Sequence, residues 1–133
     1  MRMFIDPLAV YLHRDPIDFR VGIDGLAARV EQEMALSPLT GALFIFTNRR
    51  RDRVKILYWD QTGFALWLKR LEAARFAWPR KVSEAVLTLS EDQLQWLLAG
   101  YDMKWSLRSG PHRRVLIWVL HSARILVGRQ VSE

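Results

Sequence analysis

The sequence predicts an α+β domain, in which a mostly antiparallel β-sheet of roughly four to six strands packs with two helices. Two runs rich in β-forming residues, 42–46 and 54–59, flank a polar segment, a pattern typical of a β-hairpin. Apolar residues recur at helical spacing over residues 24–35. Ser90 followed by Gln93 is a capping box, which predicts the start of a second helix.

Length and composition indicate one folded domain without covalent cross-links. The chain has 133 residues, of which 50% are hydrophobic, enough for a core and too many for a disordered tail. It contains no cysteine, which excludes disulfides and cysteine-based zinc sites. Asp6 and Pro7 interrupt any signal-peptide core, and no apolar run reaches the roughly 20 residues of a membrane span. We therefore expect a cytoplasmic protein, associated with the nucleoid if it binds DNA.

The first elements follow from turn and cap signals. Residues 7–13 are expected to form a strand that ends at Asp15-Pro16, because the residue before proline avoids the helical region. The helix over residues 24–35 should be capped by Asp24 and end before Pro38.

The segment after the hairpin fits two templates. Residues 64–71 alternate as a strand and also match a helical spacing; we favour a strand that extends the hairpin into a meander. A further short strand is expected from Arg75 to Trp78, stopped by Pro79. Residues 86–89 form a strand or a lead-in to the helix that begins after Ser90 and ends at Gly100.

Positive charge is concentrated around the hairpin. The net charge is +6 overall, with −2 over residues 1–40, +7 over residues 41–81 and +1 over residues 82–133. A local basic field of this kind suits nucleic acid. The candidate nucleic-acid-binding residues are Arg49, Arg50, Arg51 and Arg53 at the turn, with Lys55, Lys69, Arg70 and Arg75 extending the patch. The alternative is that these side chains pair with Asp52, Asp60 or Glu72 and only keep the surface soluble.

The same region carries a family resemblance. The strings GALFIFTNRRRDRVKILYWD and KRLEAARFAWP resemble the small accessory protein of the insertion sequence sixty-six family, the TnpB-type product of the second open reading frame. The accessory protein is unrelated to the RNA-guided nuclease that is also called TnpB. The resemblance covers roughly residues 15–105 and implies a role in DNA transposition beside a separate transposase, without implying a biochemical activity. The family usually has a glycine where Ala74 stands, so this chain departs from the tight turn implied there.

No arrangement of residues points to catalysis. The carboxylates at turns and element ends share no spacing that would place two on one face, and the histidines share no metal-ligand spacing. No nucleophile elbow or phosphate-binding glycine loop is present. We therefore predict a non-enzymatic protein without cofactor or metal. A metal-dependent nuclease using Asp52, Asp60 or Glu72 is the weaker alternative.

The aromatic side chains are expected in the core. Alternating or helical spacing favours burial over base stacking for this set, with Trp59 as the exception beside a turn. The set is Tyr58, Trp59, Trp67, Phe76 and Trp78.

The C-terminal part departs from the family pattern. We assign residues 1–106 to one α+β domain and residues 107–133 to an extension of unknown role, with a basic linker at 108–114 and apolar segments at 115–120 and 125–127. The extension is either an added core element or a surface for self-association into a homo-oligomer.

Together these features predict an accessory protein of transposition that binds the DNA phosphate backbone through the arginine tip and assists the transposase. Charge reversal at Arg49, Arg50 and Arg51 should weaken DNA binding and flatten its salt dependence. The rival hypothesis is a protein adaptor whose tip docks an acidic surface of the transposase or of another transposition protein, without touching DNA.

Overall fold

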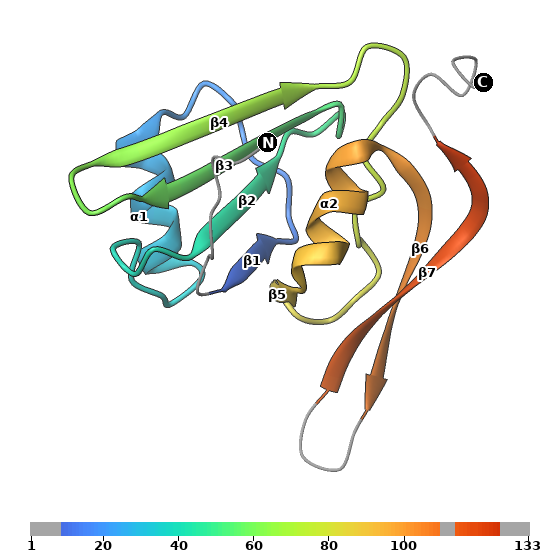
Figure 1. Ribbon diagram of the computed structural model, residues 1–133. Helices are drawn as coiled ribbons and strands as arrows, with labels where there is room; N and C mark the ends of the chain where they lie inside the picture. Colours follow the sequence, from blue (N-terminus) through green and yellow to red (C-terminus); the bar gives the residue numbers. More distant parts are fainter. Residues whose placement is uncertain (1–8, 110–113, 126–133) are drawn as a thin grey trace.

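The structure is a computed structural model that describes residues 9–109 and 114–125, with side chains described over residues 9–101. At its centre is a five-stranded sheet with the strand order β4-β3-β2-β1-β5 (Figure 1). The strands are β1 (Val10–His13), β2 (Leu43–Thr47), β3 (Arg53–Trp59), β4 (Phe64–Arg70) and β5 (Val86–Leu89). Only the β1–β2 pair of this sheet is parallel. With helices α1 (Ile23–Gln32) and α2 (Glu91–Ala99), this confirms the predicted α+β class.

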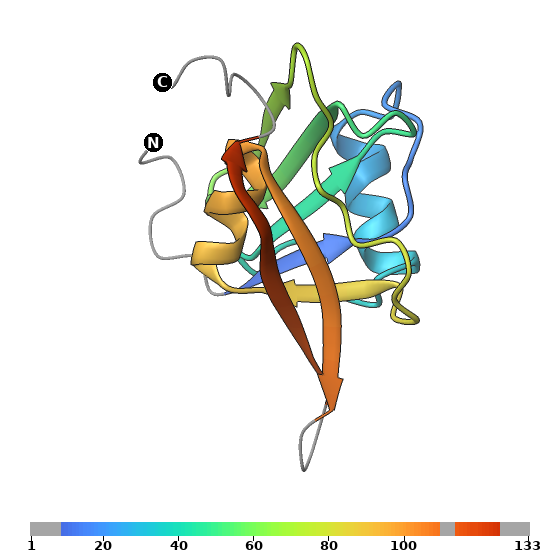
Figure 2. The same cartoon turned by 90° about the vertical axis from the view of Figure 1, so that its right-hand side faces the viewer.

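The two helices cover opposite faces of the sheet (Figure 2). Alternate residues of β2 serve both sides, so all five of its positions are buried. Phe44 and Phe46 pack in the cluster that includes α1, whereas Leu43 and Ile45 pack in the cluster that includes α2. Because successive side chains of a strand point to opposite faces, a strand between two helices is buried on both faces.

The predicted hairpin and meander are confirmed. β2 and β3 pair antiparallel from Phe44↔Leu57 to Thr47↔Val54, and residues 48–52 form the connection. β3 and β4 pair antiparallel from Arg53↔Arg70 to Trp59↔Phe64, which decides for strand over helix in residues 64–70. β4 is therefore one edge of the five-stranded sheet.

The cap predictions divide between the two helices. The capping box of α2 is confirmed: the Gln93 amide donates to Ser90 Oγ at 3.1 Å, and the Ser90 amide donates to Gln93 Oε1 at 2.8 Å. Gly100 ends the helix in the left-handed conformation, with φ 84°. The predicted cap of α1 is wrong, because Gly22 is the N-cap and Asp24 lies in the first helical turn. An acidic side chain there still interacts favourably with the helix dipole.

The predicted strand from Arg75 to Trp78 is also wrong. This segment belongs to no strand or sheet, and single hydrogen bonds join it and the residues before it to the hairpin turn. The Phe76 amide donates to the Arg51 carbonyl oxygen at 2.7 Å, and the Leu71 amide donates to the Asp52 carbonyl oxygen at 2.8 Å. The turn is thus held against the chain that follows β4.

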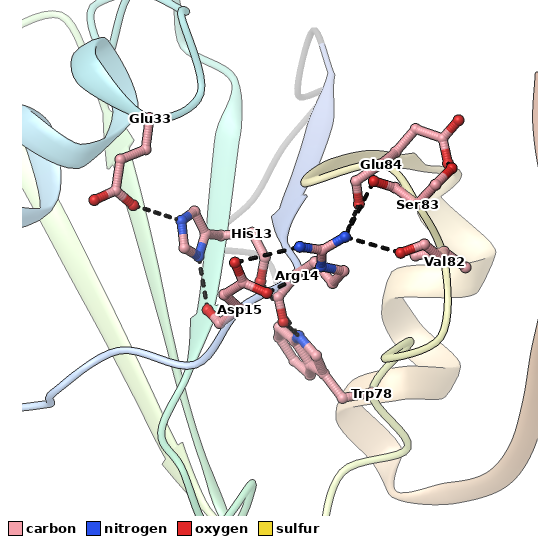
Figure 3. Close-up of polar contacts among 8 residues, drawn as sticks. All are labelled: His13, Arg14, Asp15, Glu33, Trp78, Val82, Ser83 and Glu84. Carbon is pink, nitrogen blue, oxygen red and sulfur yellow. Dashed lines mark hydrogen bonds and ion pairs between the residues drawn. The ribbon is translucent and has the colours of Figure 1, made fainter.

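A group of polar contacts fixes the same end of the sheet from β1 (Figure 3). Trp78 Nε1 donates to the carbonyl oxygens of His13 and Arg14, at 3.3 and 3.0 Å. The Arg14 guanidinium donates to the Val82 carbonyl oxygen at 2.8 Å, and His13 Nε2 lies 2.8 Å from Glu33 Oε1 just after α1. The end of β1 is therefore joined to α1 and to the chain before β5.

A separate two-stranded ribbon, β6 (Tyr101–Ser109) and β7 (Arg114–Ile125), extends away from the five-stranded sheet (Figures 1 and 2). Arg108 and Ser109, predicted as linker, belong to β6, and Arg114 of the same predicted linker begins β7, to which residues 115–120 also belong. Residues 110–113 and 126–127 lie outside the described residues, as do residues 7 and 8 of the predicted first strand. The division after residue 106 falls within β6 and stays a prediction, as does the role of the extension.

Candidate nucleic-acid interface

The topology gathers distant basic residues at one end of the sheet. β2 ends there, β3 begins there and β4 ends there, because these strands pair antiparallel in sequence order. β1 runs parallel to β2, so the chain leaving β1 passes the same place. The Ile17 amide donates to the Thr47 carbonyl oxygen at 2.9 Å and fixes that passage. The hairpin turn therefore has residues 16–20 on one side and residues 71–76 on the other.

Asn48 shapes the hairpin turn. Its side chain is nearly buried, with Oδ1 accepting from the Arg53 amide at 3.2 Å and Nδ2 donating to Asp52 Oδ1 at 2.7 Å. The hydrogen bond from Asn48, followed by the charges of Arg53 and Arg50, lowers the pKa of Asp52. Asp52 thus closes the turn through Asn48, and its carboxylate makes no ion pair with a described arginine. A turn held from within keeps the arginines around it in place.

Three arginines of the turn carry unpaired charge. Arg49 and Arg50 are exposed and Arg53 is half-buried, and within the described part of the chain none of their guanidinium groups makes a hydrogen bond or an ion pair. All three line an open groove of about 720 Å³ between the turn and residues 16–20. Unpaired guanidinium groups at a surface are the groups that phosphate oxygens contact in nucleic-acid complexes.

Arg20 is a groove residue that sequence reasoning missed. It lines the same groove from the segment before α1, with 91% of its side chain exposed. It pairs with Asp18, with Nη2 and Oδ2 2.5 Å apart, and this contact lowers the pKa of Asp18 to about 2. Since this segment meets the turn only through the β1–β2 crossover, no local sequence signal marks Arg20.

The two predicted lysines serve the fold. Lys55 lines the groove, but its Nζ donates to the carbonyl oxygens of Phe19 and Val21 at 2.8 and 2.9 Å and lies 4.9 Å from the centre of the Phe19 ring. Burial lowers its pKa. Lys69 Nζ donates to the Leu98 carbonyl oxygen at 2.7 Å, near the C-terminus of α2. Ammonium groups engaged in this way are less available to an external anion than the arginines of the turn.

The remaining predicted residues lie on the other side of the turn or are paired. Arg70 Nε bonds to Glu72 Oε2 at 3.0 Å, and Arg75 Nε donates to the Arg50 carbonyl oxygen at 2.9 Å. Arg51 has φ 59°, and its buried Nε has no partner among the described residues. Burial, followed by the charges of Arg80 and Arg75, lowers its pKa. Arg80, absent from the predicted set, therefore adds to positive charge on this side.

The three carboxylates of the nuclease alternative make separate structural contacts. Asp60 Oδ1 accepts from Thr62 and from the Gly63 amide in the β3–β4 turn, and Glu72 pairs with Arg70. Residues 9–101 contain no group of three or more His, Cys, Asp or Glu that could hold a metal ion. No helix within the described residues is both long and apolar enough to cross a membrane.

Most of the aromatic set lies in or against the core. Phe76 and Trp78 are 2% and 6% exposed, and Tyr58 and Trp67 pack against the same cluster. Trp59 is half-buried and lies edge-on to Phe64, with ring centres 5.1 Å apart. The β3–β4 register places Trp59 at the opposite end of the sheet from the arginines. The expected core role is confirmed for Phe76 and Trp78.

Comparison with known proteins gives consistent matches. Residues 8–107 match the protein family described as IS66 Orf2 like protein. Two proteins of Sinorhizobium fredii are similar: the uncharacterized protein y4jC is 36% identical and the uncharacterized protein y4hO is 37% identical, each over 95 residues. These alignments cover 71% of this chain and 80% and 82% of the relatives. No solved structure matches this chain.

Proposed function

Because the chain belongs to the IS66 Orf2-like family, which is associated with transposition, we propose that it is a non-catalytic accessory protein that binds DNA through its hairpin turn. The observation that carries the proposal is the set of unpaired guanidinium groups of Arg49, Arg50 and Arg53 on a turn held by Asn48. The DNA-bound protein would help to assemble or position the transposase at the element ends.

The shape of the hairpin suits this role. The major groove of B-DNA admits a two-stranded β-ribbon, and arginines at its tip then reach phosphates on the groove walls. Phosphate contacts give affinity that falls steeply with salt and carries little sequence information. We therefore expect binding to duplex DNA of any sequence, with positioning on the element supplied by other proteins.

The unpaired guanidinium groups of the turn also support one alternative, in which the turn binds a protein instead of DNA. A guanidinium group pairs with a carboxylate in a two-point geometry as readily as with phosphate. An acidic surface of the transposase or of another transposition protein would then be the partner of the turn. In that case, co-purification of the transposase with this protein survives nuclease treatment and is lost when Arg49 and Arg50 are replaced.

Alanine replacement of the exposed arginines tests DNA binding. The Arg49→Ala/Arg50→Ala variant should bind a fluorescein-labelled duplex roughly tenfold or more weakly than the wild type at low salt, because two phosphate contacts are lost. Both residues are exposed, so the circular-dichroism melting curve should stay unchanged.

A second double variant controls for net charge. Gln32→Glu/Gln95→Glu lowers the net charge by the same two units, at an exposed position of α1 and an exposed position in the middle of α2. Its affinity for duplex should stay within about threefold of the wild type, since it keeps the turn. Equal losses in both double variants, or no loss in either, would refute the proposed interface.

A further inference from the structure

The groove beside the turn has an apolar surface within its basic rim. Leu68 of β4 lines it with 57% of the residue exposed, and Phe19 lines it from the opposite segment. Leu68 stands opposite Lys55 in the β3–β4 register, so it lies on the same face as the ammonium that contacts Phe19. A single exposed leucine needs no explanation, but one inside a groove lined by arginines offers two kinds of contact at once.

The walls of the groove are fixed before any ligand arrives. Lys55 Nζ holds the Phe19 and Val21 carbonyl oxygens, and the Ile17 amide bonds to Thr47 in β2. Asn48 holds the turn on the other side. A groove whose walls are hydrogen-bonded to a sheet loses little entropy on binding.

The dimensions suit a nucleotide. The volume of about 720 Å³ falls in the range of roughly 300–1,000 Å³ found for sites that bind small organic molecules. The groove is open to solvent rather than enclosed, so a nucleotide bound in it can remain joined to the rest of a DNA strand.

We propose that this groove binds an unpaired nucleotide of DNA, with its phosphate at Arg49, Arg50 and Arg53 and its base against Leu68 and Phe19. The proposal rests on the proposed function and names the part of the DNA that the groove takes. Unpaired bases present their flat apolar faces to side chains, whereas a paired base in duplex DNA has both faces covered by its neighbours. Phosphate contacts alone would leave the apolar surface of the groove without a role.

The test compares three DNA duplexes that differ at one position. The first has a single-nucleotide bulge containing 2-aminopurine, the second has an abasic residue in the same bulge, and the third is fully paired. The wild-type protein should bind the base-containing bulge about fivefold more tightly than either of the others. The 2-aminopurine fluorescence should also decrease or shift on binding, because the base enters a new environment.

Two leucine variants separate the apolar contact from the charge. Leu68→Thr should remove the preference for the base-containing bulge and leave affinity for the paired duplex unchanged, since the arginines remain. Leu39→Thr is the matched control, because Leu39 is equally exposed, at 55%, and does not line the groove. Threonine suits the strand position of Leu68, Leu39 lies in a turn, and both sites are exposed, so neither change should disturb folding.

The outcomes are distinct from those for the proposed function. Equal affinity of the wild type for all three duplexes, or an equal loss for all three in Leu68→Thr, would overturn the groove proposal while duplex binding by the turn still stands. Binding to the base-containing bulge without binding to the fully paired duplex would support the groove and refute duplex binding by the turn. Absence of binding to every DNA overturns both.

Discussion

The arginines of the hairpin turn and the lysines of the adjoining strands carry the same formal charge but differ in whether that charge has a hydrogen-bond partner. Arg49 and Arg50 are exposed at the turn, and their guanidinium groups have no partner among the described residues. Lys55 and Lys69, a few residues along β3 and β4, donate to backbone carbonyl oxygens at 2.7 to 2.9 Å. The position of a charge relative to unpaired carbonyl groups, rather than its presence in a basic stretch, decides whether it is available to a ligand.

The chemistry of the two side chains agrees with this division. The lysine ammonium is a compact group on a flexible stem that can satisfy several carbonyl oxygens at an irregular surface. The planar arginine fork matches phosphate and carboxylate oxygens in two-point contacts. The comparison therefore predicts that replacing the lysines costs stability, whereas replacing the arginines costs ligand binding.

The largest effect on stability is expected from Lys55→Met. This change leaves the Phe19 and Val21 carbonyl oxygens without their donor in a half-buried region and should lower the free energy of unfolding by about 2 kcal/mol. Urea denaturation measures the difference, with Arg49→Met at the exposed turn as the control that changes it by less than about 0.5 kcal/mol. If Lys55→Met were as stable as the wild type, the division between the two groups of residues would fail.

A smaller effect is expected from Lys69→Met. The lost hydrogen bond to the Leu98 carbonyl oxygen, close to the negative end of the α2 dipole, should reduce the free energy of unfolding by about 1 kcal/mol. The affinity for duplex DNA at moderate salt should hardly change. A large loss of affinity with unchanged stability would instead assign Lys69 to the interface.

The smallest effect is expected at Asp18. Its partner Arg20 is exposed like the arginines of the turn but engaged in a contact like the lysines. Its folded pKa of about 2 lies below the ordinary value of 3.8, so the charged form is favoured in the folded state. The resulting stabilisation is complete above about pH 4 and is lost as the pH falls toward 2. An NMR titration of the side-chain carboxyl carbon should show this pKa, and Arg20→Ala should raise it toward 3.8. An unchanged pKa in that variant would show that Arg20 is not its cause.

Local sequence signals found most of the framework. The hairpin, the meander and both caps of α2 follow from alternation, turn residues and the Ser90 to Gln93 spacing, which act within a few residues. Asp24 was wrongly taken as the N-cap, because Gly22 holds that position two residues earlier and the helix begins at Ile23. The segment from Arg75 to Trp78 looks like a strand, but Arg75 and Phe76 donate to the hairpin turn and Trp78 donates to the end of β1. Alternation along the chain carries no information about such partners.

The candidate site was predictable only in part. The run of arginines and its position at a turn are visible in the sequence. Lys55 and Lys69 differ from those arginines because they donate to carbonyl groups 36 and 29 residues away in the chain. Arg20 joins the groove only because β1 pairs parallel with β2, and only the folded structure shows that Leu68 is exposed and lines the groove. These features depend on tertiary contacts, so local spacing does not reveal them.

The most direct test of the central claim is the salt dependence of duplex binding in three proteins: the wild type, Arg49→Ala/Arg50→Ala and Lys69→Met. Fluorescence anisotropy gives the slope of log affinity against log salt concentration for each. The double variant should lower the magnitude of the slope by about two, because each lost phosphate contact removes about one unit, and Lys69→Met should leave it unchanged. Equal slopes for the wild type and the double variant would contradict the claim that the arginines of the turn contact phosphates.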